Sequence, residues 1–271
     1  MDNKVKEIAE KLEKGVEELF HSEKYEAYLT TMAKFHNYSL NNSLLIWLQR
    51  PDATQVAGYK AWKDKFKRQV RKGETGIKIL APIPHKYRKE VLLDDGSVEE
   101  QEIKWTSFRA VSVFDISQTD GEPLPTICNK LTGEVEGYDD LLKKLTDTSP
   151  VPLTFEAIEG SANGCYKTME KRIVIKDGMS EAQTIKTMVH EIAHSILHDR
   201  DDGTAKDADR NTREVQAESV AYVVNKYIGL DTEDYSFGYI AGWSTGRDSK
   251  TLKESLEVIR QTANSIIEKI A

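Results

Sequence analysis

The sequence predicts an α+β protein with two domains, on three observations. Apolar residues recur at helical spacing over residues 2–35 and again from residue 180 onward. Between about 54 and 115 the pattern changes to short apolar runs separated by turn residues, which is typical of strands. A polar stretch with Gly and Pro, 117–125, is the best candidate for a linker. We therefore expect a mixed α/β domain over residues 1–125 and a second domain over residues 126–271.

The composition limits the class of protein. The chain has 271 residues, of which 39% are hydrophobic and 31% charged, as in soluble globular proteins. It contains no apolar run of the roughly 18 residues that cross a bilayer, and its charged N-terminus lacks the apolar region of a signal peptide. Cys128 and Cys165 are too few for a disulfide scaffold and have no metal-ligand spacing. We expect free thiols, a cytoplasmic location and no membrane partner.

In the N-terminal domain we expect helices first and strands afterwards. Helices are predicted within 2–35 and over 44–48, and a strand over 77–82. A hairpin is expected from 87–93 and 99–105 around the turn residues 94–97. The nearly continuous apolar run 108–115 predicts a buried, central strand.

In the C-terminal domain the pattern is mostly helical. Two short strands are expected at 153–157 and 172–176, with residues 160–171 looping between them. The second strand is either an edge strand that pairs with an extended peptide or an interior strand. The predicted helices cover residues 138–147, 180–198, 212–228 and 249–270.

The run His190-Glu191-Ile192-Ala193-His194 has the spacing HExxH. On a helix, residues four apart share a face, so His190 and His194 can meet one metal ion while Glu191 reaches its bound water. This is the signature of zincin metallopeptidases, with Glu191 as general base. It predicts Zn²⁺ first, although such donors also accept Mn²⁺ or Co²⁺. His198, one turn later, is expected to be a solvated bystander.

Zinc in such sites takes three protein ligands, so a third is needed. Glu214 and Glu218 are four apart on the next predicted helix and share a face. One can bind the ion while the other accepts a hydrogen bond from a ligand histidine, and spacing does not distinguish them. The arrangement is similar to that of gluzincin-like metallopeptidases, which implies Glu214 as ligand and Glu218 as its support.

A basic cluster interrupts an otherwise acidic chain. The net charge is −7, yet residues 59–89 hold eleven lysines and arginines against Asp64 and Glu74. Aromatic residues, among them Tyr59 and Trp62, are interleaved with these cations. Binders of single-stranded nucleic acid combine a cationic groove with aromatic faces. The alternative is a solvated helix over 60–72 whose aromatic side chains pack inward.

Several separate motifs follow one another along the chain: Tyr38–Ser39, Asn41–Asn42, Leu44–Trp47, Ala57–Trp62, Val70–Ile77, Phe114–Thr119 and Tyr239–Trp243. In this order they give the chain a resemblance to ArdC-type antirestriction proteins. The resemblance implies an N-terminal domain that binds single-stranded DNA, a zincin-like metallopeptidase domain after it, and protection of incoming plasmid or other mobile DNA from restriction.

Within the basic cluster we select residues for contact with DNA. For each of them an ordinary surface or core role is an open alternative. The expected phosphate contacts are Lys60, Lys63, Arg68, Arg71 and Lys72, and the expected stacking residues are Tyr59 and Trp62.

Three hypotheses of function follow. The favoured one is a single-stranded-DNA-binding, metal-binding antirestriction-type protein of a mobile element. The alternative is a site-specific zinc metalloprotease that cleaves a regulator, like ImmA-type proteins, for which the partner is a protein substrate. A third is a binding protein whose metal is structural.

Overall fold

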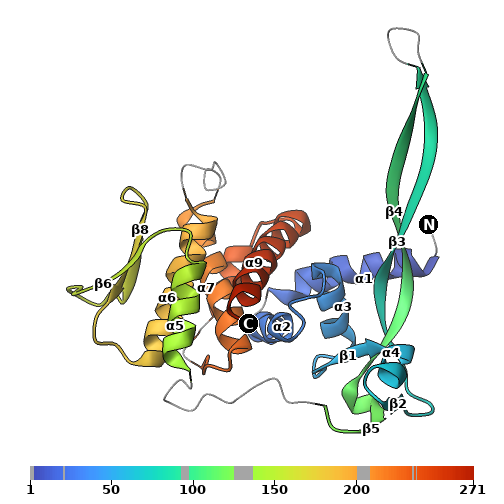
Figure 1. The fold of residues 1–271 in the computed structure, drawn as a ribbon, viewed down its shortest axis with the longest axis horizontal. Coiled ribbons are helices and arrows are strands. Elements are labelled where there is room, and N and C mark those ends of the chain that lie inside the picture. The colour runs from blue at the N-terminus through green and yellow to red at the C-terminus, as the bar shows by residue number, and fades with distance from the viewer. Residues whose placement is uncertain are drawn as a thin grey trace. The chain divides into compact units, whose positions relative to one another are not determined.

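The computed structural model describes residues 3–20, 22–92, 98–124, 137–199, 208–233, 235 and 237–271. The chain forms two compact units, coloured by residue number in Figure 1. Unit 1 comprises Met1–Lys14 and Leu44–Glu122, and unit 2 comprises Gly15–Ser43 and Pro123–Ala271. The mixture of helices and strands confirms the α+β class. The predicted domain boundary at residue 125 stays a prediction. In the structure residues 15–43 belong to the same compact unit as the C-terminal part of the chain.

Unit 1 is built mainly from antiparallel strands. Its three-stranded sheet has the order β1-β4-β3, and β2 pairs separately with β5. Two helices, α1 (Asn3–Leu19) and α3 (Leu40–Gln49), each contribute residues to both units. The other elements of unit 1 are β1 (Val56–Gly58), α4 (Tyr59–Asp64), β2 (Arg68–Val70), β3 (Ile77–Leu92), β4 (Val98–Asp115), the 3-10 helix η1 (Ile116–Gln118) and β5 (Thr119–Gly121).

Strands β3 and β4 form one long ribbon, visible as the extended pair in Figure 1. The register is unbroken from Ile77 opposite Val113 to Leu92 opposite Val98, so the four predicted strands are two. The predicted turn 94–97 lies outside the described residues. β4 is central in the sheet as predicted, but the predicted burial is wrong over most of 108–115: Phe108 is 52% exposed, and only Val113 and Asp115 are buried in that stretch.

The first part of the expected linker is structured. The Asp115 side chain accepts hydrogen bonds from the Ser117 backbone N–H and the Ser117 hydroxyl and caps η1, and Thr119–Gly121 pairs with β2. The linker prediction is therefore wrong for residues 117–121. Pro125 lies outside the described residues.

Unit 2 contains most of the helices and a small mixed sheet of order β6-β8-β7. Because β8 is the middle strand, its interpretation as a peptide-binding edge is wrong. The two edges are β6 and β7, and β7 falls in the predicted loop 160–171. The predicted helices are confirmed. The elements are α2 (Ser22–Lys34), α5 (Tyr138–Thr148), β6 (Leu153–Glu156), β7 (Gly164–Lys167), β8 (Arg172–Lys176), α6 (Glu181–Leu197), α7 (Arg210–Tyr227), α8 (Ile240–Ser244) and α9 (Ser249–Ile270).

The core of unit 2 fixes α6 and α7 side by side. On α6, Ile185, Met188, Val189 and Ile192 are fully buried, which follows the helical spacing of the sequence. Ser180 caps α6 and Asp209 caps α7, each side chain accepting from a backbone N–H of the first turn. No helix within the described part of the chain is long and apolar enough to span a bilayer.

Candidate metal centre

Helices α6 and α7 bring three of the predicted site residues together. His190 and His194 lie on one face of α6, with their Nε2 atoms 3.1 Å apart. One Glu214 carboxylate oxygen from α7 lies 3.5 Å from His194 Nε2 and 3.9 Å from His190 Nε2. The donor atoms of all three residues lie within 4.8 Å of one another. Two imidazoles and a carboxylate are a donor set that Zn²⁺, Mn²⁺ or Co²⁺ accepts.

The protonation states suit metal binding. Burial, reinforced by the neighbouring His194, lowers the pKa of His190 to about 4, so this imidazole is neutral at physiological pH. The hydrogen bond with His194 lowers the pKa of Glu214, which keeps its carboxylate charged. A neutral imidazole and a carboxylate are the forms that donate electron pairs to a cation.

A chain of hydrogen bonds fixes His194. Its Nδ1 lies 3.0 Å from His198 Nδ1, and His198 Nε2 lies 3.1 Å from Gln216 Oε1. Because an amide oxygen only accepts, His198 carries its hydrogen on Nε2 and accepts on Nδ1 from His194. His194 Nε2 is then left with a lone pair toward His190 and Glu214. The expectation of a solvated His198 is wrong: it is 3% exposed.

The amide of Gln216 is oriented in turn by α9, since its Nε2 donates to Ser255 Oγ at 3.2 Å. Sequence reasoning missed Gln216 altogether. Its position two residues after Glu214 places it on another side of α7, and nothing in the pattern links it to His198. Arg210 and Arg213 also line the cavity at the site and were not predicted.

Glu218 does not make the predicted contact with a ligand histidine. Its carboxylate accepts a hydrogen bond from the Tyr239 hydroxyl, and burial raises its pKa. The position four residues on carries it one helical turn away from Glu214, toward Tyr239. Glu218 still lines a cavity of about 260 Å³ shared with His190 and Glu191.

Glu191 is buried beside the donor set, 8% exposed. Burial raises the pKa of its carboxyl group, although the Tyr166 backbone N–H donates to it. It lines a cavity of about 500 Å³ together with His190, His194 and Glu214. This arrangement places a carboxyl group of raised pKa next to the three donor atoms.

Strand β7 closes one side of this cavity, and Gly164 permits it. A Cβ at Gly164 would lie 2.7 Å from Thr187 Cγ2 on α6, closer than side chains tolerate. Glycine therefore lets the strand approach the helix. Cys165, next in β7, has a free thiol as predicted, and burial raises its pKa. Cys128 lies outside the described residues.

In unit 1, Trp62 is not available to stack on a base. Its side chain is fully buried, and its Nε1 donates to the Phe114 carbonyl oxygen at 2.8 Å. The prediction of Trp62 as a stacking residue is wrong, because its place on α4 faces the sheet. The alternative of inward-packing aromatics is confirmed for this residue, but the helix ends at Asp64 and does not run to 72.

Two predicted phosphate contacts have their guanidinium groups engaged inside unit 1. Arg68 donates to the Thr119 hydroxyl at 2.7 Å and to the Thr119 carbonyl at 2.9 Å. Arg71 forms an ion pair with Glu74 at 2.8 Å and with Asp120 at 3.4 Å. Both arginines therefore hold β2 against its neighbours.

The other predicted DNA contacts are exposed. Tyr59 is 50% exposed, and Lys60 and Lys63 are exposed beside it on α4. Tyr59 and Lys72 both line a hollow of about 630 Å³. Among the described residues none forms an ion pair with Lys60, Lys63 or Lys72.

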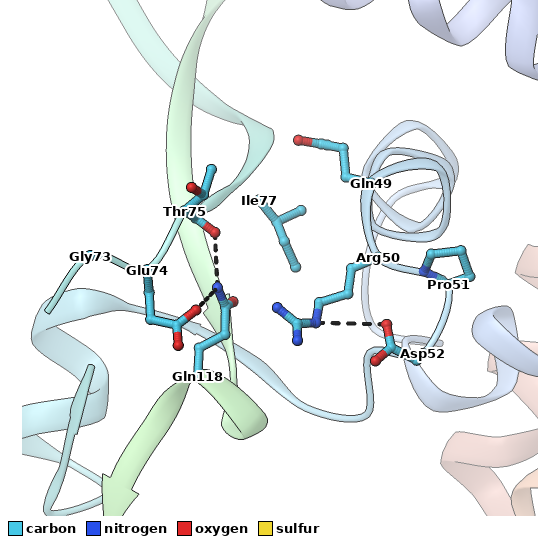
Figure 2. Close-up of a pocket in the computed structure, with 10 residues that line it drawn as sticks. Gln49, Arg50, Pro51, Asp52, Gly73, Glu74, Thr75, Ile77 and Gln118 are labelled. Atoms are coloured by element: carbon cyan, nitrogen blue, oxygen red, sulfur yellow. Dashed lines mark hydrogen bonds and ion pairs between the residues drawn. The ribbon is translucent and has the colours of Figure 1, made fainter. Parts of the chain in front are cut away.

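Figure 2 shows a second hollow of unit 1, of about 620 Å³, between the end of α3 and the turn before β3. Gln49 exchanges two hydrogen bonds of 2.9 Å with the Lys78 backbone, and Gln118 donates at 2.9 Å to Glu74 and to the Thr75 carbonyl. Arg50 points into the space, 3.7 Å from Asp52. Most of these polar groups are hydrogen-bonded to one another. These bonds hold the turn before β3 in place.

Comparison with known proteins gives two matches to family models. Residues 1–114 match the N-terminal domain of anti-restriction factor ArdC, and residues 151–265 match the IrrE N-terminal-like domain of the M78 peptidases. An uncharacterized protein of Bacillus anthracis is 29% identical over 308 residues, covering 98% of this chain and 51% of the relative. The chain thus spans about half the length of that curated relative.

Solved structures show the same fold. The metal-free antirestriction ArdC protein from the R388 plasmid has a TM-score of 0.54 at 20% identity. The Mn(II)-bound form of that protein has a TM-score of 0.53 at 18% identity. Each alignment covers 86% of this chain and 85% of the other.

Proposed function

We propose that this chain, which has the ArdC-type antirestriction architecture of an ArdC N-terminal domain followed by an IrrE-like M78 domain, binds both single-stranded DNA and a divalent metal ion. Its M78 domain belongs to the zincin-like metallopeptidase superfamily. In this proposal the protein is cytoplasmic and protects incoming DNA of a mobile element from restriction. The observation that carries it is the meeting of His190, His194 and Glu214 in the M78 domain of a chain whose ArdC domain holds the basic cluster.

In the proposed metal site His190, His194 and Glu214 are the ligands. The distances favour Glu214 over Glu218 as the third, because Glu218 bonds to Tyr239. A bound ion of this kind lowers the pKa of its water toward about 7 and polarises a carbonyl group. Zn²⁺ is the first expectation, and Mn²⁺, the ion in the R388 relative's structure, and Co²⁺ fit the same donors.

In the proposed DNA site the exposed residues of the basic cluster contact the strand. Lys60, Lys63 and Lys72 supply positive charge for phosphates, and the exposed ring of Tyr59 supplies a stacking face. Arg68 and Arg71 act indirectly, because their hydrogen bonds hold β2 in place.

The test is metal analysis of the purified protein beside His190→Ala, with a titration of both by single-stranded DNA at several salt concentrations. We expect His190→Ala to lose metal and keep DNA binding, with a salt slope that reflects several ion contacts. A flat salt response, or no binding at low salt, rejects DNA binding. Equal metal content in both proteins rejects the metal site.

A second candidate function is a site-specific zinc metalloprotease with a protein substrate. The observation that favours it is Glu191, buried beside the three donors with a carboxyl group of raised pKa. Glu191→Gln keeps the shape and removes the base, so it should abolish peptide cleavage while metal content is unchanged. A structural metal or a pure DNA-binding function survives this substitution.

A further inference from the structure

The β3–β4 ribbon has two chemically different faces. Residues directly opposite in an antiparallel pair lie on the same face, and neighbours along a strand alternate. His85 opposite Trp105 and Tyr87 opposite Ile103 therefore share one face, and Lys86 opposite Lys104 lies on the other. We call the first the aromatic face. It includes Ile83, His85, Tyr87, Ile103, Trp105 and Arg109.

The charges of the opposite face are paired with one another. Lys86 and Lys104 lie 4.0 Å and 3.2 Å from Glu102, and Arg88 lies 3.2 Å from Glu100. Such exposed pairs contribute little stability, but they leave that face nearly neutral. The opposite face is therefore a solvated surface.

The aromatic face is different. Between Ala81 and Tyr87, and on the paired stretch Ile103 to Arg109, it carries no acidic residue. Arg109 is exposed and has no ion pair or hydrogen-bond partner among the described residues. This face thus presents aromatic rings and one uncompensated cation.

Two rings of this face, His85 and Trp105, are held in position. His85 stacks on Trp105 with ring centroids 4.0 Å apart and planes at 11°, and His85 Nε2 lies 2.7 Å from Ser107 Oγ. Trp105 and Tyr87 are still 51% and 50% exposed. Exposed aromatic side chains that are already ordered lose less entropy when a ligand stacks on them. The face is prepared for a flat, apolar partner.

We propose that the aromatic face is a stacking platform for the bases of single-stranded DNA, with Arg109 reaching a phosphate. The inference rests on the proposed function, that the protein binds single-stranded DNA, and names a surface outside the residues selected above. Charge complementarity favours DNA: between Ala81 and Tyr87 and between Ile103 and Arg109 the aromatic face carries the cation Arg109 and no acidic residue. A single strand offers unstacked bases to aromatic faces, and a duplex does not.

Tryptophan fluorescence tests the platform, because Trp105 is the exposed member of the four tryptophans. Trp47, Trp62 and Trp243 are 7%, 0% and 8% exposed. The probe is an oligothymidylate of about 20 nucleotides, longer than the ~4–16-nucleotide sites of known single-strand binders. We expect it to quench the fluorescence of Trp105 and to shield it from iodide, and we expect an abasic oligomer of equal length to do neither.

Two variants form a matched pair. Trp105→Ala should weaken oligothymidylate binding about 5- to 150-fold, the range for loss of one base–aromatic stack, with the salt slope unchanged. Phe108→Ala removes a ring of similar exposure, 52%, from the opposite face and should bind as the wild type does. Arg109→Ala should reduce the salt slope by about 1. Thermal melting of each variant shows that the fold is kept.

Failure of this inference is separable from failure of the proposed function. If the wild type binds no oligothymidylate, the proposed DNA binding fails and the platform with it. If the wild type binds, but Trp105→Ala binds equally well or the abasic oligomer competes equally, the platform alone is overturned. A concentration-dependent dimer that Trp105→Ala dissociates would also overturn it, in favour of self-association.

Discussion

The candidate metal centre and the basic cluster differ in how their side chains are held. Around the metal centre His198, Gln216 and Ser255 form a chain of hydrogen bonds that ends on His194, largely out of water. In the basic cluster Lys60, Lys63 and Lys72 are exposed and make no ion pair with other described residues. A metal ion needs donors fixed within a fraction of an ångström, whereas a phosphate chain is attracted by charge that tolerates movement.

This difference has a consequence for mutation. Damage to a pre-organised centre spreads through its connected groups, so single substitutions have large effects. Substitution of an exposed cation removes one phosphate contact, so the losses of DNA affinity from several such substitutions should add. Five predictions test the contrast, from the largest expected effect to the smallest.

Trp62→Ala should have the largest effect, although Trp62 lies within the basic cluster, because its side chain is part of the core. We expect a loss of about 3–5 kcal/mol in the free energy of unfolding of unit 1, as for other large aromatics in cores. Chemical denaturation measures it, with the exposed neighbour Tyr59→Ala as control. A stability change below about 1 kcal/mol would contradict the burial of Trp62.

Glu214→Ala compared with Glu218→Ala tests which carboxylate is the ligand. We expect Glu214→Ala to reduce metal affinity by more than the roughly 100-fold that loss of an orienting group costs at most. Glu218→Ala should have a much smaller effect, because Glu218 bonds to Tyr239. Competition with a chromogenic chelator measures both affinities, and a larger effect at Glu218 would reverse the assignment.

His198→Ala removes the group that fixes the tautomer of His194. We expect metal affinity to fall about 10- to 100-fold, the usual cost of losing an orienting partner, and DNA binding to be unchanged. The same chelator competition measures it. An unchanged affinity would mean that the hydrogen bond to His198 does not orient the ligand.

Asp209→Ala tests the attachment of the helix that carries Glu214. Loss of this N-cap should lower the free energy of unfolding by about 0.5–2 kcal/mol at neutral pH. The hydrogen bond from the Thr212 backbone lowers the pKa of Asp209 below its usual 3.8, so its carboxylate stabilises the fold above pH 3.8. That contribution is lost as the pH falls through the lowered pKa, where the unfolding curves of variant and wild type should converge.

Lys60→Ala should have the smallest effect. Removal of one exposed phosphate contact should reduce the salt slope of single-stranded DNA binding by about 1 and weaken binding to all sequences equally. A double variant with Lys63→Ala should show the sum of the two single effects. Strong non-additivity would show that the lysines act as a connected group, as the metal centre does.

Sequence patterns gave reliable results where local rules decide the structure. The helices over 181–197, 210–227 and 249–270 follow apolar spacing and capping residues that lie within each segment. The meeting of His190 and His194 follows from the helical repeat alone. The two-domain ArdC-type order was likewise predictable, because each motif is local in the sequence.

Where distant segments meet, the patterns failed. β7 was missed because only pairing with β8 makes that short polar stretch a strand. The apolar run 108–115 looked buried, yet it lies in the β3–β4 ribbon, where the described residues leave Phe108 52% exposed. The sequence favoured Trp62 as a stacking residue, but its position on α4 directs its side chain toward the Phe114 backbone.

By itself the sequence determined the helical segments, the HExxH pair and the clustering of positive charge, because all three are properties of neighbouring residues. The tertiary structure decided that Glu214 rather than Glu218 lies beside the histidines, that Gln216 and His198 orient His194, and that aromatic rings gather on one face of the β3–β4 ribbon. Each of these depends on the angle and register at which one element packs against another, which no periodicity within a single element encodes.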